Sequence, residues 1–335
     1  MATPLSRRDR VMATVAGDDV DRPPMSFWGH FYDREESARD LAEATLEFRG
    51  RYDWDFVKLN PRASYHGEGW GLSYSWDKNP LHKPTRLSYP VKGASDLARI
   101  RALPGDSGAL GEQLEAIRLV RAGLPDDVLL IETVFSPMGV LADLFENTEA
   151  TQRMLAEDAP AVTRTLDAIT RTFEDFVPRA LHAGADGIYF ATLEWASSDR
   201  GWTPADYRAL AMPFDLRVLA KAAGAPFNVL HVCRARNFLS SLTDYPVAAF
   251  SWATTDPGNL SLQEGLKSFR GAAIGGIGHE DALVAPDDRL ALAQLASGFE
   301  QTAGRRWIVA PGCSILPATP PERLEALREA VLSHA

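Results

Sequence analysis

The sequence predicts an α/β protein in which eight parallel strands alternate with helices and close into a (β/α)8 TIM barrel. Three observations support this fold class. Eight short apolar runs bounded by turn residues recur at fairly regular spacing, stretches with helical periodicity lie between them, and 335 residues suffice for one such barrel. No linker, internal repeat or low-complexity segment interrupts the pattern, so we predict a single domain over residues 1–335.

The strand candidates are nearly continuous in apolar residues. The runs LLIETVF and FNVLHVC are examples, and this pattern is typical of strands that are buried on both faces of a parallel sheet. No G-x-G-x-x-G follows an early strand, which disfavours an open dinucleotide-binding sheet. The predicted strands are residues 24–28, 56–60, 129–135, 187–193, 227–233, 247–252, 272–278 and 307–313.

Helices are predicted between the strands. Two of them begin with a threonine followed by proline, at Thr203-Pro204 and Thr319-Pro320, which is a helix-start signal. Residues 61–95 are rich in aromatic residues, glycine and proline, and we interpret them as an insertion after strand two, over the carboxyl-end mouth of the barrel. The predicted helices are residues 37–50, 107–122, 150–182, 204–222, 261–269, 284–303 and 320–333.

Charge and composition exclude several classes of protein. Asp and Glu outnumber Lys and Arg by 45 to 35, which gives a net charge of −10 and argues against nucleic acid or an anionic membrane as partner. The N-terminus lacks a signal-peptide pattern, no apolar run is long enough to span a membrane, and two cysteines are too few for a disulfide scaffold. We therefore expect a cytoplasmic protein.

The sharpest chemical pattern is His231-Val232-Cys233 together with Cys313. Alternate residues of a strand face the same side, so His231 and Cys233 can bind one ion, and Cys313 ends the last strand. One imidazole and two thiolates suit zinc, and three protein ligands leave a fourth position open. The alternative is that both cysteines are buried small side chains and His231 is a hydrogen-bonded core histidine.

The stretches PAVTRTLDAITRTFEDFVPRALHAGADGIYF, FNVLHVC and IVAPGCSILPATPPERLEALREAV resemble the uroporphyrinogen decarboxylase superfamily. The resemblance extends from about residue 7 to residue 333 and implies a (β/α)8 barrel. This superfamily contains decarboxylases and zinc-dependent methyltransferases of the methylcobamide:coenzyme M type. The resemblance to the second branch implies that His231, Cys233 and Cys313 are its zinc ligands.

Two departures separate this chain from the decarboxylase branch. Those enzymes carry an R-Q-A-G-R-Y loop after strand one, where this chain has Trp28-Gly29-His30-Phe31-Tyr32-Asp33-Arg34. They also carry an aspartate after strand two, where this chain has Val57-Lys58-Leu59-Asn60. A porphyrinogen would lack its principal partners here, so a metal-free decarboxylase-like lyase is the first alternative. A non-catalytic protein that captures a ligand at a zinc or thiol site is the second.

The resemblance implies methyl transfer between a methylcorrinoid and a zinc-activated thiol. Zinc would bind the thiol at its open position and favour loss of the thiol proton. The chain has no D-x-H-x-x-G corrinoid-binding motif, so the corrinoid is expected on a partner protein or as a free cofactor. The expected partners are thus a corrinoid protein and a small thiol, and the expected state is a monomer or homodimer.

Other residues near strand ends are candidates for binding or proton transfer. Glu194 and His279 are predicted to act in catalysis, as a transient ligand, proton acceptor or substrate contact, although a solvated loop carboxylate and a polar helix start explain them equally. Glu132 is a candidate to support the site from within strand three. We expect four residues to line the mouth and contact the corrinoid or other substrate, with core packing as the alternative: His30, Tyr65, His66 and Trp70.

Overall fold

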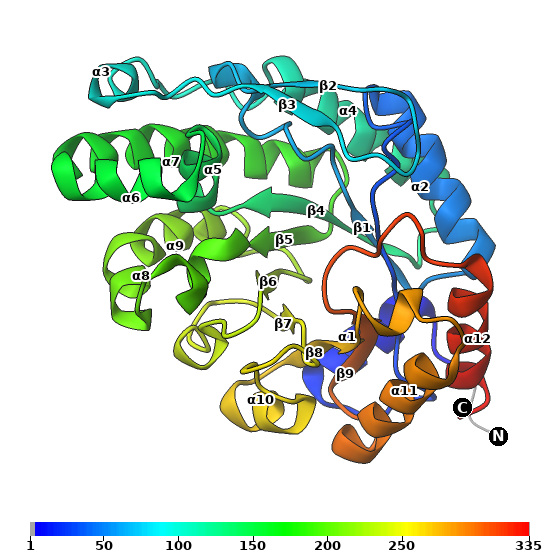
Figure 1. Ribbon diagram of the computed structural model, residues 1–335. Helices are drawn as coiled ribbons and strands as arrows, with labels where there is room; N and C mark the ends of the chain where they lie inside the picture. Colours follow the sequence, from blue (N-terminus) through cyan, green and yellow to red (C-terminus); the bar gives the residue numbers. More distant parts are fainter. Residues whose placement is uncertain (1–3, 335) are drawn as a thin grey trace.

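The computed structural model describes residues 4–334, and at its centre lies a curled parallel sheet of seven strands (Figure 1). Strand order follows chain order, and every neighbouring pair is parallel. The strands are β1 (Phe56–Leu59), β4 (Leu129–Phe135), β5 (Gly187–Ala191), β6 (Val229–Val232), β7 (Ala249–Trp252), β8 (Ala272–Ile277) and β9 (Trp307–Pro311).

Residues 24–28, predicted as the first strand, are extended but form only an isolated bridge between Met25 and Val309. The Val309 N–H donates to the carbonyl of Pro24 at 2.8 Å, and the Asp55 N–H donates to the carbonyl of Met25 at 3.0 Å. The segment therefore contacts both edges of the sheet, β9 and β1. It is not a regular strand because Pro24 has no N–H and the Met25 N–H donates to the Asp55 carboxylate instead of to β1. The architecture is consistent with a TIM-like fold.

Helices cover the outside of the sheet. The predicted helix 150–182 is two helices, because Asp158 caps a new start by accepting from the Ala161 N–H at 3.0 Å. The predicted helix 204–222 is also divided, with Pro213 in the first turn of the second part. The helices are α1 (Arg7–Ala16), α2 (Ala38–Tyr52), α3 (Ala94–Leu97), α4 (Gly108–Gly123), α5 (Pro137–Asp143), α6 (Thr148–Glu157), α7 (Ala159–His182), α8 (Pro204–Leu210), α9 (Met212–Ala220), α10 (Leu262–Ser268), α11 (Arg289–Thr302) and α12 (Pro321–Leu332).

Short 3₁₀ turns connect several of these elements. One precedes the hairpin, two follow β5, one follows β6, and one, Ala282–Val284, occupies the start of the predicted helix 284–303. The turns are η1 (Glu68–Trp70), η2 (Leu193–Ala196), η3 (Ser198–Arg200), η4 (Leu239–Ser241) and η5 (Ala282–Val284). Among the described residues, no helix is both long and apolar enough to cross a bilayer.

The two faces of the sheet pack into different apolar layers. Alternation along β6 sends Val229 to the inner layer, together with Phe56 and Ile131, whereas Leu230 and Val232 pack against the helices. His231 lies between Leu230 and Val232 in the strand and therefore shares the inner face with Val229.

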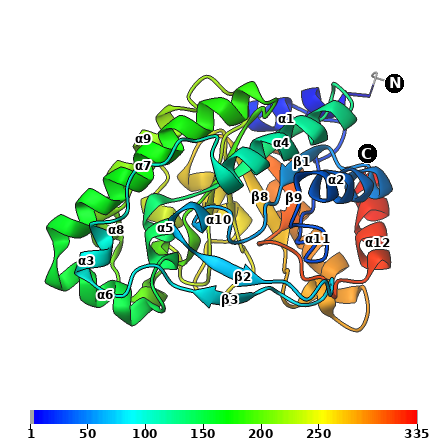
Figure 2. The ribbon, with the colours of Figure 1, turned by 90° about the horizontal axis from the view of Figure 1, so that it is seen from above.

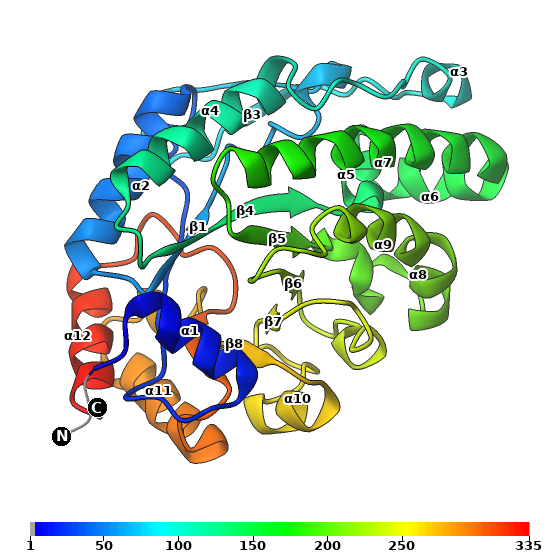
Figure 3. The same ribbon diagram turned by 180° about the vertical axis from the view of Figure 1, so that it is seen from behind.

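The two ends of the sheet are covered differently. Residues 61–95 contain an antiparallel hairpin of β2 (Ser73–Ser75) and β3 (Thr85–Ser88). Figure 2 shows this hairpin and α1 on opposite sides of the sheet, and Figure 3 shows α1 from its own side. Val11 of α1 is fully buried against the inner apolar layer, so α1 closes the amino end while the hairpin lies toward the carboxyl end.

Candidate metal centre

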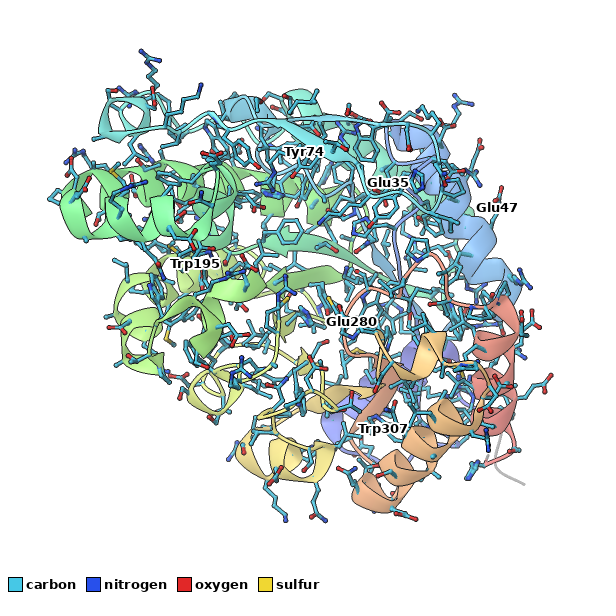
Figure 4. The ribbon with its side chains drawn as sticks, viewed as in Figure 1. Glu35, Glu47, Tyr74, Trp195, Glu280 and Trp307 are labelled. Atoms are coloured by element: carbon cyan, nitrogen blue, oxygen red, sulfur yellow. The ribbon has the colours of Figure 1, made fainter. Side chains whose placement is uncertain are left out.

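A cavity of about 710 Å³ lies at the carboxyl ends of the strands. Its walls include residues that follow each of the seven strands and three side chains of the hairpin region, Tyr74, Lys83 and Arg86. Two lining residues labelled in Figure 4, Tyr74 and Glu280, come from distant parts of the chain. A volume of this size accommodates a small-molecule or cofactor-sized ligand.

His231, Cys233 and Cys313 meet in the wall of this cavity. Their ligand atoms all lie within 4.8 Å of one another, close enough to share one ion. Cys313 reaches this position because Gly312 precedes it, where a Cβ atom would come within 2.8 Å of the Ala253 Cα. The structure thus brings the three predicted metal ligands together, although β7 and β8 separate their strands in the sheet.

The His231 ring is held from behind. Its Nδ1 lies 3.1 Å from the Ser251 Oγ, which lies 3.0 Å from the Tyr189 hydroxyl, and the Tyr189 ring stacks on the imidazole at 5.1 Å. The Nε2 atom is buried and has no hydrogen-bond partner in the described chain. Buried polar atoms normally have partners, so a free Nε2 beside two cysteines is suited to bind a metal.

The loop after Cys233 has an unusual backbone conformation and is fixed by side-chain hydrogen bonds. Arg234 has a positive φ of 71°, which is uncommon outside glycine. The Nδ2 groups of Asn237 and Asn259 both donate to the Arg234 carbonyl, at 3.2 and 3.0 Å, and Asn237 also donates to the Val232 carbonyl. These bonds on both sides of Cys233 fix the direction in which the chain leaves β6.

The electrostatics of the site favour a thiolate at Cys313. The Cys233 thiol lowers the pKa of Cys313 well below the usual cysteine value, against the opposing effect of burial, and His231 lowers it further. Interaction with Cys313, followed by burial, raises the pKa of Cys233. Burial lowers the pKa of Lys58 to about 8, although Cys313 raises it. A thiolate is the form of cysteine that binds metals.

The two predicted catalytic side chains both line the cavity. The carboxylate of Glu194 forms ion pairs with Arg200 and Arg234, the second at 3.2 Å. His279 lies beside the metal ligands, because its Nδ1 would be 3.2 Å from a Cβ atom placed on Gly312. The Nδ1 of His279 is buried without a hydrogen-bond partner among residues 4–334. His279 is therefore free to interact at the site, while Glu194 is engaged by arginines.

Two of the four predicted mouth residues line the cavity. His30 does so with its Nδ1 2.8 Å from the Glu35 carboxylate, and His66 does so with its Nε2 2.9 Å from Asp143. Tyr65 and Trp70 do not line it, contrary to the prediction. The Tyr65 hydroxyl donates to a β4 carbonyl, and the Trp70 indole donates to the Arg101 carbonyl at 2.8 Å, so both rings are used in packing.

Glu132 does not support the site. It lies in β4 on the face that packs against the helices, where its carboxyl accepts a bond from Gln113 of α4 at 3.0 Å. Three residues that contribute to the site were not predicted: Lys58, Tyr189 and Ser251. Their positions alternate with outward-facing residues of β1, β5 and β7, and this alternation is the signal that would have placed them on the inner face.

The comparisons with known proteins assign the family. A sequence model of the family named uroporphyrinogen decarboxylase (URO-D) matches residues 6–334, so this chain belongs to that family. One relative is the methylcobamide:CoM methyltransferase MtaA of Methanosarcina barkeri, which is 24% identical over 348 residues, covering 96% of each protein.

Solved structures agree on the fold. A structure described as a methyltransferase from Methanosarcina mazei is similar with a TM-score of 0.79 at 22% identity, covering 98% of this chain and 99% of that one. A B12-independent methionine synthase from Shewanella sp. W3-18-1 has a TM-score of 0.57 at 10% identity, covering 93% and 95%. Both similarities extend over nearly the whole chain.

Proposed function

We propose that this protein is a zinc-dependent methyltransferase that moves a methyl group between a methylcorrinoid and a thiol. The observation that carries the proposal is the meeting of His231, Cys233 and Cys313 at a large cavity, with the His231 Nε2 buried and unpartnered. The relative from M. barkeri, named a methylcobamide:CoM methyltransferase, supports the same reaction class. The family match over residues 6–334 supports one TIM-barrel domain.

The residues present fit zinc. One imidazole nitrogen and two sulfurs form a ligand set that zinc prefers, and the arrangement leaves a position open toward the cavity. The chemistry that zinc would supply is Lewis-acid activation, which makes a bound thiol acidic enough to be a thiolate near neutral pH. His231 would bind through Nε2, because Ser251 holds Nδ1.

The chain's own residues would position the substrates and accept the proton. His279, with its free Nδ1 beside Cys313, is suited to accept the thiol proton and release it to solvent. Glu194 and its two arginines border the cavity, where they would contact substrate rather than take up a proton. His30 and His66 lie in the cavity wall, where they would contact the corrinoid.

The proposed methyl transfer needs no reagent other than the thiol and the methylcorrinoid. The thiolate sulfur attacks the methyl carbon, the sulfur–carbon bond forms as the cobalt–carbon bond breaks, and the electron pair of that bond stays with cobalt. The cavity would bring the two reactants together, which converts a bimolecular reaction into one between bound partners. The corrinoid is proposed to arrive on a separate protein, with the enzyme itself a cytoplasmic monomer or homodimer.

The alternative is a metal-free decarboxylase acting on a porphyrinogen or another carboxylated substrate. Lys58, Lys83 and Arg86 are cations in the cavity wall that could hold carboxylates. Arg86, however, already contacts Asp143 and the Tyr74 hydroxyl. The metal-ligand cluster has no part in this reaction, so we rank it second.

The test begins with zinc content per chain, measured by elemental analysis on the wild type and on Cys313→Ser. We expect about one zinc in the wild type and clear loss in the variant. The wild type is then supplied with methylcobalamin and 2-mercaptoethanol, and loss of the methylcobalamin absorbance is followed. A protein that binds no zinc under reducing conditions, or that demethylates neither methylcobalamin nor a methylated corrinoid protein with any thiol, contradicts the proposal.

A further inference from the structure

Lys58 of β1 is a buried ammonium group on the inner face of the sheet. The residue is 6% exposed, and it lines the same cavity as the metal ligands. Its Nζ donates to the Asn60 side-chain oxygen, and no carboxylate oxygen of residues 4–334 lies within 4.0 Å of it. Buried lysines are rare unless they are paired with a negative charge, so Lys58 needs an anionic partner.

Two carboxyl groups that act on the charge of Lys58, those of Glu132 and Glu35, do not serve as that partner. Glu132 faces the helix layer, where its carboxyl accepts a bond from Gln113 at 3.0 Å and burial raises its pKa well above the usual value, although Gln113 and Lys58 lower it. Glu35 directs one oxygen to the His30 ring and to the Phe31 N–H, each at 2.8 Å. Neither group forms an ion pair with Lys58.

Two other groups that act on the charge of Lys58 are the sulfurs of Cys313 and Cys233, the candidate metal ligands. The Nζ lies 4.6 Å from the centre of the Tyr189 ring, and that ring stacks on His231 at 5.1 Å. Burial lowers the pKa of Lys58, whereas Cys313 and, less strongly, Cys233 raise it. Lys58 therefore lies against the Tyr189 ring, which in turn stacks on His231.

A count of charges explains why a lysine is placed there. A divalent ion with the thiolates of Cys233 and Cys313 is neutral, and a third thiolate, from the substrate, would give the site one net negative charge. An uncompensated charge is costly away from water. We propose that Lys58 supplies the positive charge that balances the substrate thiolate at the metal centre.

This inference rests on the proposed function and adds a positioning residue to it. Lys58 would act through the electrostatic effect of its charge on the metal centre, and it would neither form nor break a covalent bond. When the thiol binds, its S–H bond breaks, the electron pair stays on sulfur, and the proton leaves to solvent. Lys58 makes that loss of a proton easier, so the thiolate forms at lower pH than it would without the lysine.

The test uses the Co²⁺-loaded protein, in which thiolate binding produces a charge-transfer absorbance that can be followed against pH. The probes are 2-mercaptoethanol, which is neutral, and 3-mercaptopropionate, which carries an anion. The variants are Lys58→Met, Lys58→Gln and Lys58→Arg. Lys92→Met is the control, because Lys92 is exposed and does not line the cavity.

We expect Lys58→Met to raise the midpoint for both thiols by about one pH unit, which is about tenfold weaker binding at a fixed pH below the midpoint. Lys58→Arg should keep the midpoint near that of the wild type, and Lys92→Met should not move it. If Lys58→Met does not fold, Lys58→Gln gives the same comparison. Circular dichroism and the Co²⁺ content verify that each variant is folded and loaded.

Three results would overturn the inference. An unchanged midpoint in a Co²⁺-loaded Lys58→Met shows that the lysine does not balance the thiolate. Weaker binding of 3-mercaptopropionate alone shows that Lys58 binds the anionic end of a substrate instead. A wild type that takes up no Co²⁺ removes the proposed function together with the inference, and so is distinguishable from the first two results.

Discussion

The two ends of the curled sheet use their polar groups in opposite ways. At the amino end, the fully buried Asp55 accepts bonds from Arg10, Arg22 and the Met25 N–H, all at 2.7 to 3.0 Å. Arg10 also pairs with Asp21 through two bonds of 2.7 and 2.6 Å. Each charge has a partner, which is what a network built for stability requires.

At the carboxyl end, three buried imidazole nitrogens have no partner among the described residues: His231 Nε2, His279 Nδ1 and His66 Nδ1. All three histidines line the cavity. Leaving such atoms unpaired costs stability, so they indicate a surface prepared for a ligand. The contrast shows that the paired charges that stabilise the fold and the imidazoles available to a ligand lie at opposite ends of the sheet, as the barrel architecture favours.

The strongest test of this separation is removal of the metal. Treating the loaded protein with a chelator should lower methyl transfer by about 10³-fold or more, because a metal ion contributes several kcal/mol to such reactions. The far-UV circular dichroism at 25 °C should stay that of a folded protein, since the amino-end network and both apolar layers remain. Added zinc should restore activity. Unfolding on chelation would show that the metal centre also holds the fold together.

The converse test is Asp55→Asn. Removing the carboxylate leaves Arg10 and Arg22 buried without their shared counter-charge, and we expect a loss of about 3–5 kcal/mol in the free energy of unfolding, measured with urea. Zinc content should be unchanged. Asp127→Asn is the control, because its partially exposed pair with Arg7 should contribute less than about 1 kcal/mol. Loss of zinc in folded Asp55→Asn would contradict the separation of the two ends.

This contrast also explains what the sequence could predict. Period-two and period-3.6 patterns depend on burial, so the seven strands and most helices were predictable. The segment 24–28 was not, because its irregularity depends on the Asp55 side chain, which takes a backbone N–H that a strand would use. Helix 150–182 was predicted too long because Asp158 and Pro160 start a new helix inside one continuous apolar stripe.

The meeting of His231, Cys233 and Cys313 was predictable because the chain's two cysteines both fall at the ends of predicted strands, one of them two residues after a histidine. Lys58 and Ser251 were not, because strand alternation places them on the inner face but only the curvature of the sheet brings them near His231. Trp70 was misplaced because an aromatic residue in the insertion 61–95 fits a mouth and a packing site equally well. The hydrogen bond from its indole N–H to the Arg101 carbonyl, which only the structure shows, identifies the packing site.

A third region, the helix layer, contains a carboxyl group whose pKa differs between the folded and the unfolded state. Asp215 is fully buried between the hydroxyls of Tyr207 and Tyr245, each donating at 2.8 Å, and burial raises its pKa to about 7. In the unfolded chain the carboxyl would lose its proton near pH 3.8. Between these values the folded state binds more protons than the unfolded state, so the free energy of unfolding falls as pH rises from about 4 to about 7.

For Asp215 this decrease amounts to at most about 4 kcal/mol. Asp215→Asn, which cannot ionise, should show a correspondingly flatter dependence when urea unfolding is measured at several pH values. Methyl transfer should keep the same pH profile in both proteins, because Asp215 lies outside the cavity. Parallel stability curves for the two proteins would show that Asp215 is already ionised in the folded state.

The smallest effect is expected from Ser251→Ala, which tests whether the contact between Ser251 and His231 contributes to metal binding. This change removes the oxygen beside His231 Nδ1 but leaves all three metal ligands, so zinc affinity should fall by about 10- to 100-fold, measured by competition with a chelating dye. Tyr189→Phe is the matched control, because it keeps the ring that stacks on His231 and removes only the hydroxyl beyond Ser251. Its effect should be smaller. Equal zinc affinity in Ser251→Ala and the wild type would show that stacking on Tyr189 alone orients the imidazole. The boundary between residues that stabilise the fold and residues that bind the ion would then lie at the three predicted ligands.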